Sequence, residues 1–130
     1  MADFDHERLD VYRASIEFVG AATQLVEGLP RGWASLGDQL QRASISIPLN
    51  IAEGAGELSS KEKARFYRMA ARSATECAAI LDVCRHLQLS EAQRVSAARD
   101  LLVRIVSMLT RLAKTHQKAG DGDGNGDGDG

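Results

Sequence analysis

Two rows of cations are the residues in this sequence best suited to bind a charged partner. At spacings of three, four or seven residues, side chains share one face of an α-helix, so each row could follow the phosphates of a nucleic acid with strongly salt-dependent affinity. The alternative is a solvated face, or pairing with acids of the same or a neighbouring subunit. The first row is Lys61, Arg65, Arg68 and Arg72, and the second is Arg104, Arg111 and Lys118, with Lys114 nearby.

Polar residues around Pro48 form the second candidate. A proline inside a helix frees the carbonyl four residues earlier, here that of Ser44, and costs about 3 kcal/mol, so we expect a kink with compensating local hydrogen bonds. Asn50 and Glu53 fall on one edge of this helix, with Ser46 one turn before Asn50. These groups either pin the kink or a contact between helices, or contribute to a binding or catalytic site.

Patterns that indicate an enzyme or a metal centre are weak. Di-iron bundles place a Glu-x-x-His pair on each of two helices, and the sequence contains no such pair. Cys84 and His86 are close in sequence but point to different faces of a helix. Gly54 and Gly56 lack the later glycine and the lysine of a phosphate-binding loop. We therefore expect no enzymatic activity, no bound metal and no cofactor.

The elements that must position these residues are four amphipathic helices. Apolar residues recur every three or four positions in four segments. The first runs from about residue 5 to 27, the second from 33 or 35 to 54–56, and the third and fourth begin at residues 59 and 90. The segment from Gly28 to Gly32 should end the first helix, and Gly54 or Gly56 in the left-handed conformation should end the second. Ser59 and Ser90 should cap the third and fourth helices. The inward residues predicted for the first helix are Leu9, Tyr12, Ile16, Val19, Thr23 and Val26.

Four such helices joined by short turns predict an all-α fold, an antiparallel up-down-up-down four-helix bundle over residues 1–118. A three-helix arrangement, in which the second segment breaks at Pro48, is the competing possibility. Residues 119–130 alternate Gly with Asp or Asn and cannot bury apolar surface, which predicts a disordered tail. Residues 121–126 match the first half of a calcium loop but lack its twelfth-position glutamate, so a solubilising tail is the better interpretation.

Composition favours a single cytoplasmic domain. The 130 residues carry a net charge of −2, yet four of the 18 acids lie in the tail, which leaves 14 acids against 16 bases elsewhere. The acidic start lacks the features of a signal peptide, and the longest uncharged run, residues 43–52, is about half of a bilayer span. Cys77 and Cys84 lie seven apart on one predicted helix, about 10 Å, which is beyond disulfide reach. Reduced core cysteines fit the cytoplasm.

Three segments carry a recognisable motif. They begin at Leu9, Leu36 and Phe66, and their motif residues include Pro48, Asn50, Glu53, Gly54, Ser73 and Glu76. These segments resemble the four-helix-bundle family first noticed as proteins encoded in bacterial 23S rRNA intervening sequences, and the resemblance spans residues 4 to 116. It implies a small cytoplasmic homopentamer with a central channel and no established enzymatic activity. A related branch, the accessory proteins of diversity-generating retroelements, implies binding to nucleic acid and a reverse transcriptase.

The sequence therefore favours a non-enzymatic scaffold that assembles with copies of itself. Apolar residues left over from the predicted core stripes would need to be covered by another subunit. The alternative is a nucleic-acid-binding accessory protein that uses the two basic rows, although Glu57 stands where the family often has arginine. The surplus residues are Val11, Phe18, Ile45, Leu49, Tyr67, Leu81, Leu102 and Val106.

Overall fold

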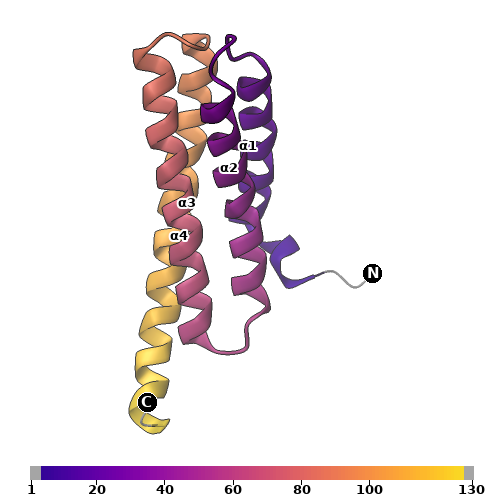
Figure 1. Cartoon of the computed structure of the whole chain (residues 1–130). Coiled ribbons are helices and arrows are strands. Elements are labelled where there is room, and N and C mark those ends of the chain that lie inside the picture. The colour runs from indigo at the N-terminus through magenta and orange to yellow at the C-terminus, as the bar shows by residue number, and fades with distance from the viewer. Residues whose placement is uncertain (1–3, 128–130) are drawn as a thin grey trace.

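Helices make up every regular element of the computed structural model, which describes residues 4–127 and the side chains of residues 4–121. Each helix packs against two others, α1 on α2, α2 on α3, α3 on α4 and α4 on α1, so the four close into one bundle (Figure 1). Short turns connect them, which makes successive helices antiparallel, and the predicted all-α up-down-up-down fold is confirmed. The elements are a 3-10 turn, η1 (Asp5–Arg8), and the helices α1 (Asp10–Glu27), α2 (Ala34–Gly56), α3 (Ser60–His86) and α4 (Ala92–Asp127).

Helix α2 continues through Pro48, which rules out the three-helix arrangement. Pro48 itself is buried, so its ring packs inside the bundle. Helix packing therefore outweighs the cost of the missing amide, which is about 3 kcal/mol in an isolated helix interior.

The helix ends only partly follow the predicted signals. The Ser59 hydroxyl accepts a hydrogen bond from the Glu62 amide at 3.2 Å and caps α3 as expected. Ser90 does not cap α4, because in the described chain its buried Oγ accepts no hydrogen bond from a backbone amide at the start of that helix. Gly54 and Gly56 do not take the left-handed conformation either, which among the described glycines occurs only at Gly32. Gly54 has a different role, which is described below.

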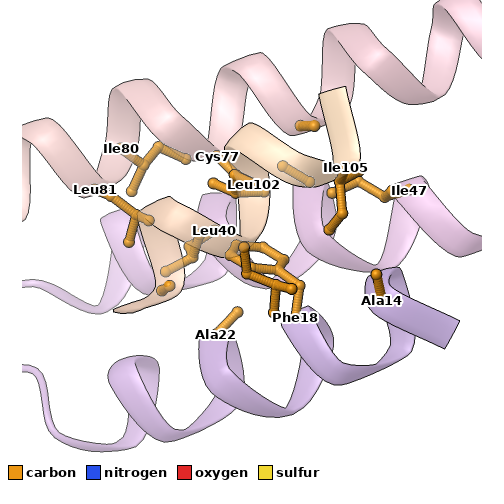
Figure 2. Packing of buried hydrophobic residues seen from close by; sticks show 14 of the residues in the cluster. Ala14, Phe18, Ala22, Leu40, Ile47, Cys77, Ile80, Leu81, Leu102 and Ile105 are labelled. Atoms are coloured by element: carbon orange, nitrogen blue, oxygen red, sulfur yellow. The ribbon is translucent and has the colours of Figure 1, made fainter. Parts of the chain in front are cut away.

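The core stripe of α1 lies about one residue away from the predicted one. Phe18 is fully buried and points into the middle of the bundle (Figure 2), whereas Ile16 is 47% exposed. Apolar residues occur at helical spacing on both possible faces of α1, so periodicity alone could not choose between them. The face with the small residues Ala14 and Ala22 on either side of Phe18 lets one large ring fill the centre.

Most of the residues predicted to be surplus belong to this core. Val106 also packs against the core, so only Ile45 and Leu49 of the predicted set are exposed. The monomer therefore covers more of its own apolar surface than the predicted stripes allowed. The residues that moved into the core are Val11, Phe18, Tyr67, Leu81 and Leu102.

Helix α4 runs to Asp127 and so enters the segment that was predicted to be a tail from residue 119. In Figure 1 this last part of α4 extends beyond the start of α3. Gly120 lies against α3, since a Cβ built on it would be 3.3 Å from the backbone nitrogen of Lys61. Extending a formed helix adds one hydrogen bond per residue without a new nucleation cost, which offsets the low helix propensity of glycine. Residues 128–130 of the predicted tail lie outside the described residues.

Candidate functional site

Two regions on opposite flanks of α3 gather the residues that the sequence singled out. The α2–α3 junction consists of Ser46, Asn50, Gly54, Lys63 and Ser73 with the residues that they contact. The α3–α4 groove is a hollow of about 700 Å³ between those two helices. Its lining residues are Arg68, Ala71, Arg72, Thr75, Val106, Leu109, Thr110, Ala113, Lys114, Gln117, Lys118 and Asp121.

Ser46 is the centre of the junction. Its hydroxyl oxygen accepts hydrogen bonds from the Asn50 amide at 3.0 Å and from the Ser73 hydroxyl on α3 at 2.9 Å. The Asn50 Nδ2 also donates to the Ser46 carbonyl at 2.9 Å, one turn before it. Polar groups in the half-buried seam between α2 and α3 are therefore satisfied by one another, and they link the two helices beside Pro48.

Gly54 lets the end of α2 approach α3. A Cβ at this position would lie 2.9 Å from Cε1 of Tyr67 and 3.1 Å from Cβ of Phe66, closer than packed side chains tolerate. Lys63 then caps the end of α2, because its Nζ donates to the carbonyls of Gly54 at 3.3 Å and Ala55 at 2.8 Å. Sequence reasoning missed Lys63, because a lysine after a helix end carries no signal of which carbonyls it will reach.

The two motif glutamates do not take part in these contacts. Glu53 and Glu76 are exposed, and within the described residues neither forms a hydrogen bond or an ion pair. Beside Glu76, burial raises the pKa of the Cys77 thiol to about 12, with the Glu76 charge adding to the effect. A thiol with such a pKa stays protonated at neutral pH and is a poor nucleophile. Burial likewise raises the pKa of the Cys84 thiol.

A ring contact joins α3 to α4 at the same end of the bundle. Tyr67 lies 5.7 Å from His116 between ring centroids, and burial raises the pKa of the Tyr67 phenol. Burial lowers the pKa of His116, and the positive charge of Lys63 lowers it further. The neutral imidazole is thus the form that this contact favours.

The α3–α4 groove has an apolar floor and a cationic rim. Leu109 and Ala113 are buried along its floor. Arg68 and Arg72 line it from α3, and Lys114 and Lys118 line it from α4. All four cations are exposed to water, and they stand above the buried residues of the floor.

The rim cations are among the exposed cations that have no carboxylate partner in the described chain. In the part of the chain that the structure describes, none of the four forms an ion pair, and Arg68 donates at 2.7 Å to the neutral side chain of Gln117. Asp121 at the end of the groove accepts from Gln117 at 3.5 Å. The arginines that do pair with Asp or Glu are Arg13, Arg65, Arg85, Arg94 and Arg99.

The two predicted basic rows do not merge into one surface. Arg65 pairs with Glu62 at 3.1 Å and lies over the Phe66 ring, away from the groove lining. Arg111 lines a separate hollow of about 270 Å³ between α1 and α4. Arg104 and Lys61 are exposed but line neither hollow. The groove therefore combines half of the first row with Lys114 and Lys118 of α4.

Comparison with known proteins identifies one family. A family model described as the 23S rRNA-intervening sequence protein matches residues 7–111. No curated protein matches the chain. The matched segment contains the whole α2–α3 junction but ends before Lys114 and Lys118, so half of the groove's cationic rim lies outside it.

Proposed function

We propose that this chain, which belongs to the 23S rRNA-intervening sequence protein family, is a non-enzymatic interaction protein that assembles with copies of itself. Five subunits are the number that the sequence resemblance implies. The reduced, buried state of Cys77 and Cys84 fits the cytoplasm, where thiols stay reduced. In support of a non-enzymatic role, the junction hydroxyls bond to one another, and both thiols are buried and have raised pKa values.

The observation that carries the proposal is an exposed apolar patch on α1 and α2. Leu49 is 61% exposed and Ile45, one turn before it, is 40% exposed. The Gln41 amide donates to the Thr23 hydroxyl at 3.0 Å, which sets the register of these antiparallel helices. Ile16 lies seven residues before Thr23 on α1, and Pro48 lies seven residues after Gln41 on α2. In antiparallel helices these two positions are level, so Ile16 is at the height of the segment from Ile45 to Leu49. We call Ile16, Ile45 and Leu49 the α1–α2 patch.

Burial of this patch would give an assembly its driving force. Fully burying an exposed aliphatic side chain of this size contributes about 1.5–3 kcal/mol, and these three are already about half covered in the monomer, so each would add roughly half of that to an interface. In a ring of identical subunits, the patch of one subunit would pack on a different face of the next. Each subunit would then contribute this patch to one neighbour and a different face to the other.

Sedimentation velocity at micromolar concentration tests the assembly. A pentamer would sediment as a species of about 70 kDa, five times the 14.0 kDa of the chain. Leu49→Glu should dissociate it, because it places a charge in a dry interface. Val103→Glu changes a residue on α4 that is 59% exposed, and should leave the assembly intact. A wild type that sediments only as a 14.0 kDa species would rule out self-assembly.

Nucleic-acid binding ranks second, because the separation of the two rows reduces its support. Cations of both rows gather in the groove, and no aromatic side chain is among its lining residues to stack on bases. Gel-shift titration at 50 and 200 mM salt decides the question. Tight, salt-sensitive binding that Arg65→Gln/Arg68→Gln abolishes would favour this second function over the scaffold.

A further inference from the structure

We propose that the α3–α4 groove is a docking site for an acidic amphipathic helix of a partner protein. This goes beyond self-assembly, because it uses a different face of the bundle from the α1–α2 patch. Three properties support it, namely the length and floor of the groove, the position of its cations, and the mismatch between those cations and this chain's own exposed helix faces.

The groove is long enough for a helix. A second hollow of about 310 Å³ continues the first one along α3 and α4, and the two share Thr75 and Val106. On α4 the combined lining runs from Arg99 to Asp121, which spans roughly 33 Å, or about six helical turns. A groove of this length between two antiparallel helices fits the recognition mode in which an amphipathic helix lies in an apolar groove.

The side chains of the floor suit a closely packed helix. Ala71, Ala78 and Ala113 line the seam with small side chains, which would let a third helix approach at ordinary interhelical distance. Val103 is 59% exposed at one end and would be covered by the incoming helix. An apolar seam gives a phosphate backbone nothing to contact, whereas it buries the apolar stripe of a helix.

The charge of the groove is confined to one end. Arg68, Arg72, Lys114 and Lys118 lie toward the start of α3 and the end of α4, and with Asp121 beside them this end keeps an excess of positive charge. At the other end, Arg99 is neutralised by Asp82 at 3.0 Å. The complementary helix therefore carries an apolar stripe along its length and two or more carboxylates near one end, which the rim cations can pair with as water leaves the seam.

The exposed apolar stripe of α2 matches that pattern only in part. Arg42 is exposed one turn before Ile45 and Glu53 is exposed one turn after Leu49, so this stripe has a cation at one end and a single carboxylate at the other. A helix with two or more carboxylates and no cation beside its stripe complements the rim cations better. The occupant that the groove fits is therefore a helix from a different protein.

A pair of synthetic peptides tests the inference on the full-length protein. The probe is a helical peptide of roughly 18 residues, five turns, with leucines along one face and glutamates flanking the stripe at one end. The matched peptide has lysine in place of each glutamate. By fluorescence anisotropy at 50 mM salt the glutamate peptide should bind at least tenfold more tightly than the lysine peptide, and 200 mM salt should reduce this advantage several-fold.

Variants of the protein then locate the site. Arg72→Gln/Lys114→Gln should weaken binding of the glutamate peptide at least tenfold, whereas Arg104→Gln/Arg111→Gln removes two cations that do not line the groove and should change it less than twofold. Thr110→Trp keeps every charge but fills the seam, and should also weaken binding tenfold. All five positions are exposed, and circular dichroism establishes that each variant is folded.

Four results would overturn the inference. These are no binding of the glutamate peptide, equal binding of the two peptides, no effect of either groove variant, and dissociation of the assembled protein by Arg72→Gln/Lys114→Gln, which would assign the groove to a second copy of this chain. Oligonucleotide binding that is lost in the same variant, and that the glutamate peptide fails to displace, would assign the groove to nucleic acid instead.

Discussion

The α2–α3 junction and the α3–α4 groove are built on opposite flanks of one helix, and adjacent residues of α3 belong to each. Ser73 donates a hydrogen bond to Ser46 on α2, while Arg72 lines the groove toward α4. In the junction the serine hydroxyls and the Asn50 amide bond to one another, whereas the rim cations of the groove have no carboxylate partner in the described chain. Polar groups that satisfy one another hold the fold, and those left without a partner are available for binding.

This contrast makes a quantitative claim. Changes in the junction should lower the free energy of unfolding, because they leave half-buried polar groups without partners or force packed helices apart. Changes to the rim cations should leave stability within about 0.5 kcal/mol, because exposed charges contribute little to folding.

Gly54→Val should be the most damaging of these substitutions. A Cβ at position 54 already meets the Tyr67 ring at 2.9 Å, and valine adds two methyl groups in the same space, so we expect a loss of about 3 kcal/mol in unfolding free energy. Gly56→Val is the matched control, since a Cβ there meets no described atom within 4 Å. Urea denaturation of both variants measures the difference. Equal stability of the two would mean that the close approach at Gly54 does not limit the packing.

The serine link between α2 and α3 should contribute less. Ser46→Ala removes the acceptor of both the Asn50 and the Ser73 side chains, with an expected cost of about 1–2 kcal/mol. A double-mutant cycle of Ser46→Ala and Ser73→Ala isolates the contact between the helices, and we expect a coupling energy of about 0.5–1 kcal/mol. Strict additivity of the two substitutions would show that the hydroxyls do not interact.

His116 should add a small pH dependence at the same end of the bundle. Its pKa in the folded protein is lowered by burial and by Lys63, so the unfolded chain binds the proton more tightly. The stabilisation is complete above the ordinary histidine pKa near 6.5 and is lost as the pH falls below it. Melting temperatures at pH 7.5 and 5.5 should therefore converge in His116→Gln, relative to wild type. The exposed His86→Gln is the control, and an identical change in it would remove His116 as the cause.

The junction and the groove also differ in how far the sequence could reveal them. In α2 one face is apolar at Leu40, Ile47 and Ile51, which are all buried, so the periodicity of the sequence indicates the buried side of this helix. In α1 two apolar stripes compete, and only the packing of Phe18 against the other three helices decides between them. Pro48 and its polar neighbours were identifiable because a proline within a helical pattern demands compensation.

The groove was not predictable, because it depends on tertiary register. The spacing of Lys61, Arg65, Arg68 and Arg72 places them on one broad face, but the position of α4 decides which of them line the groove. Arg65 instead forms an ion pair with Glu62 one turn away, and Arg68 donates a hydrogen bond to Gln117 on α4, 49 positions later in the sequence. Neither the α4 cations that complete the rim nor the Lys63 cap on α2 can be derived from periodicity within one helix.

The most direct test compares the two adjacent residues of α3 in two assays. Ser73→Ala should lower the unfolding free energy by about 1 kcal/mol and leave the affinity for the glutamate peptide unchanged. Arg72→Gln should leave the unfolding free energy within about 0.5 kcal/mol of wild type and weaken peptide binding several-fold. Urea denaturation and fluorescence anisotropy on the same protein samples give all four values. If Arg72→Gln destabilised the fold as much as Ser73→Ala, or if Ser73→Ala weakened binding as much as Arg72→Gln, the division of α3 into a structural flank and a binding flank would be contradicted.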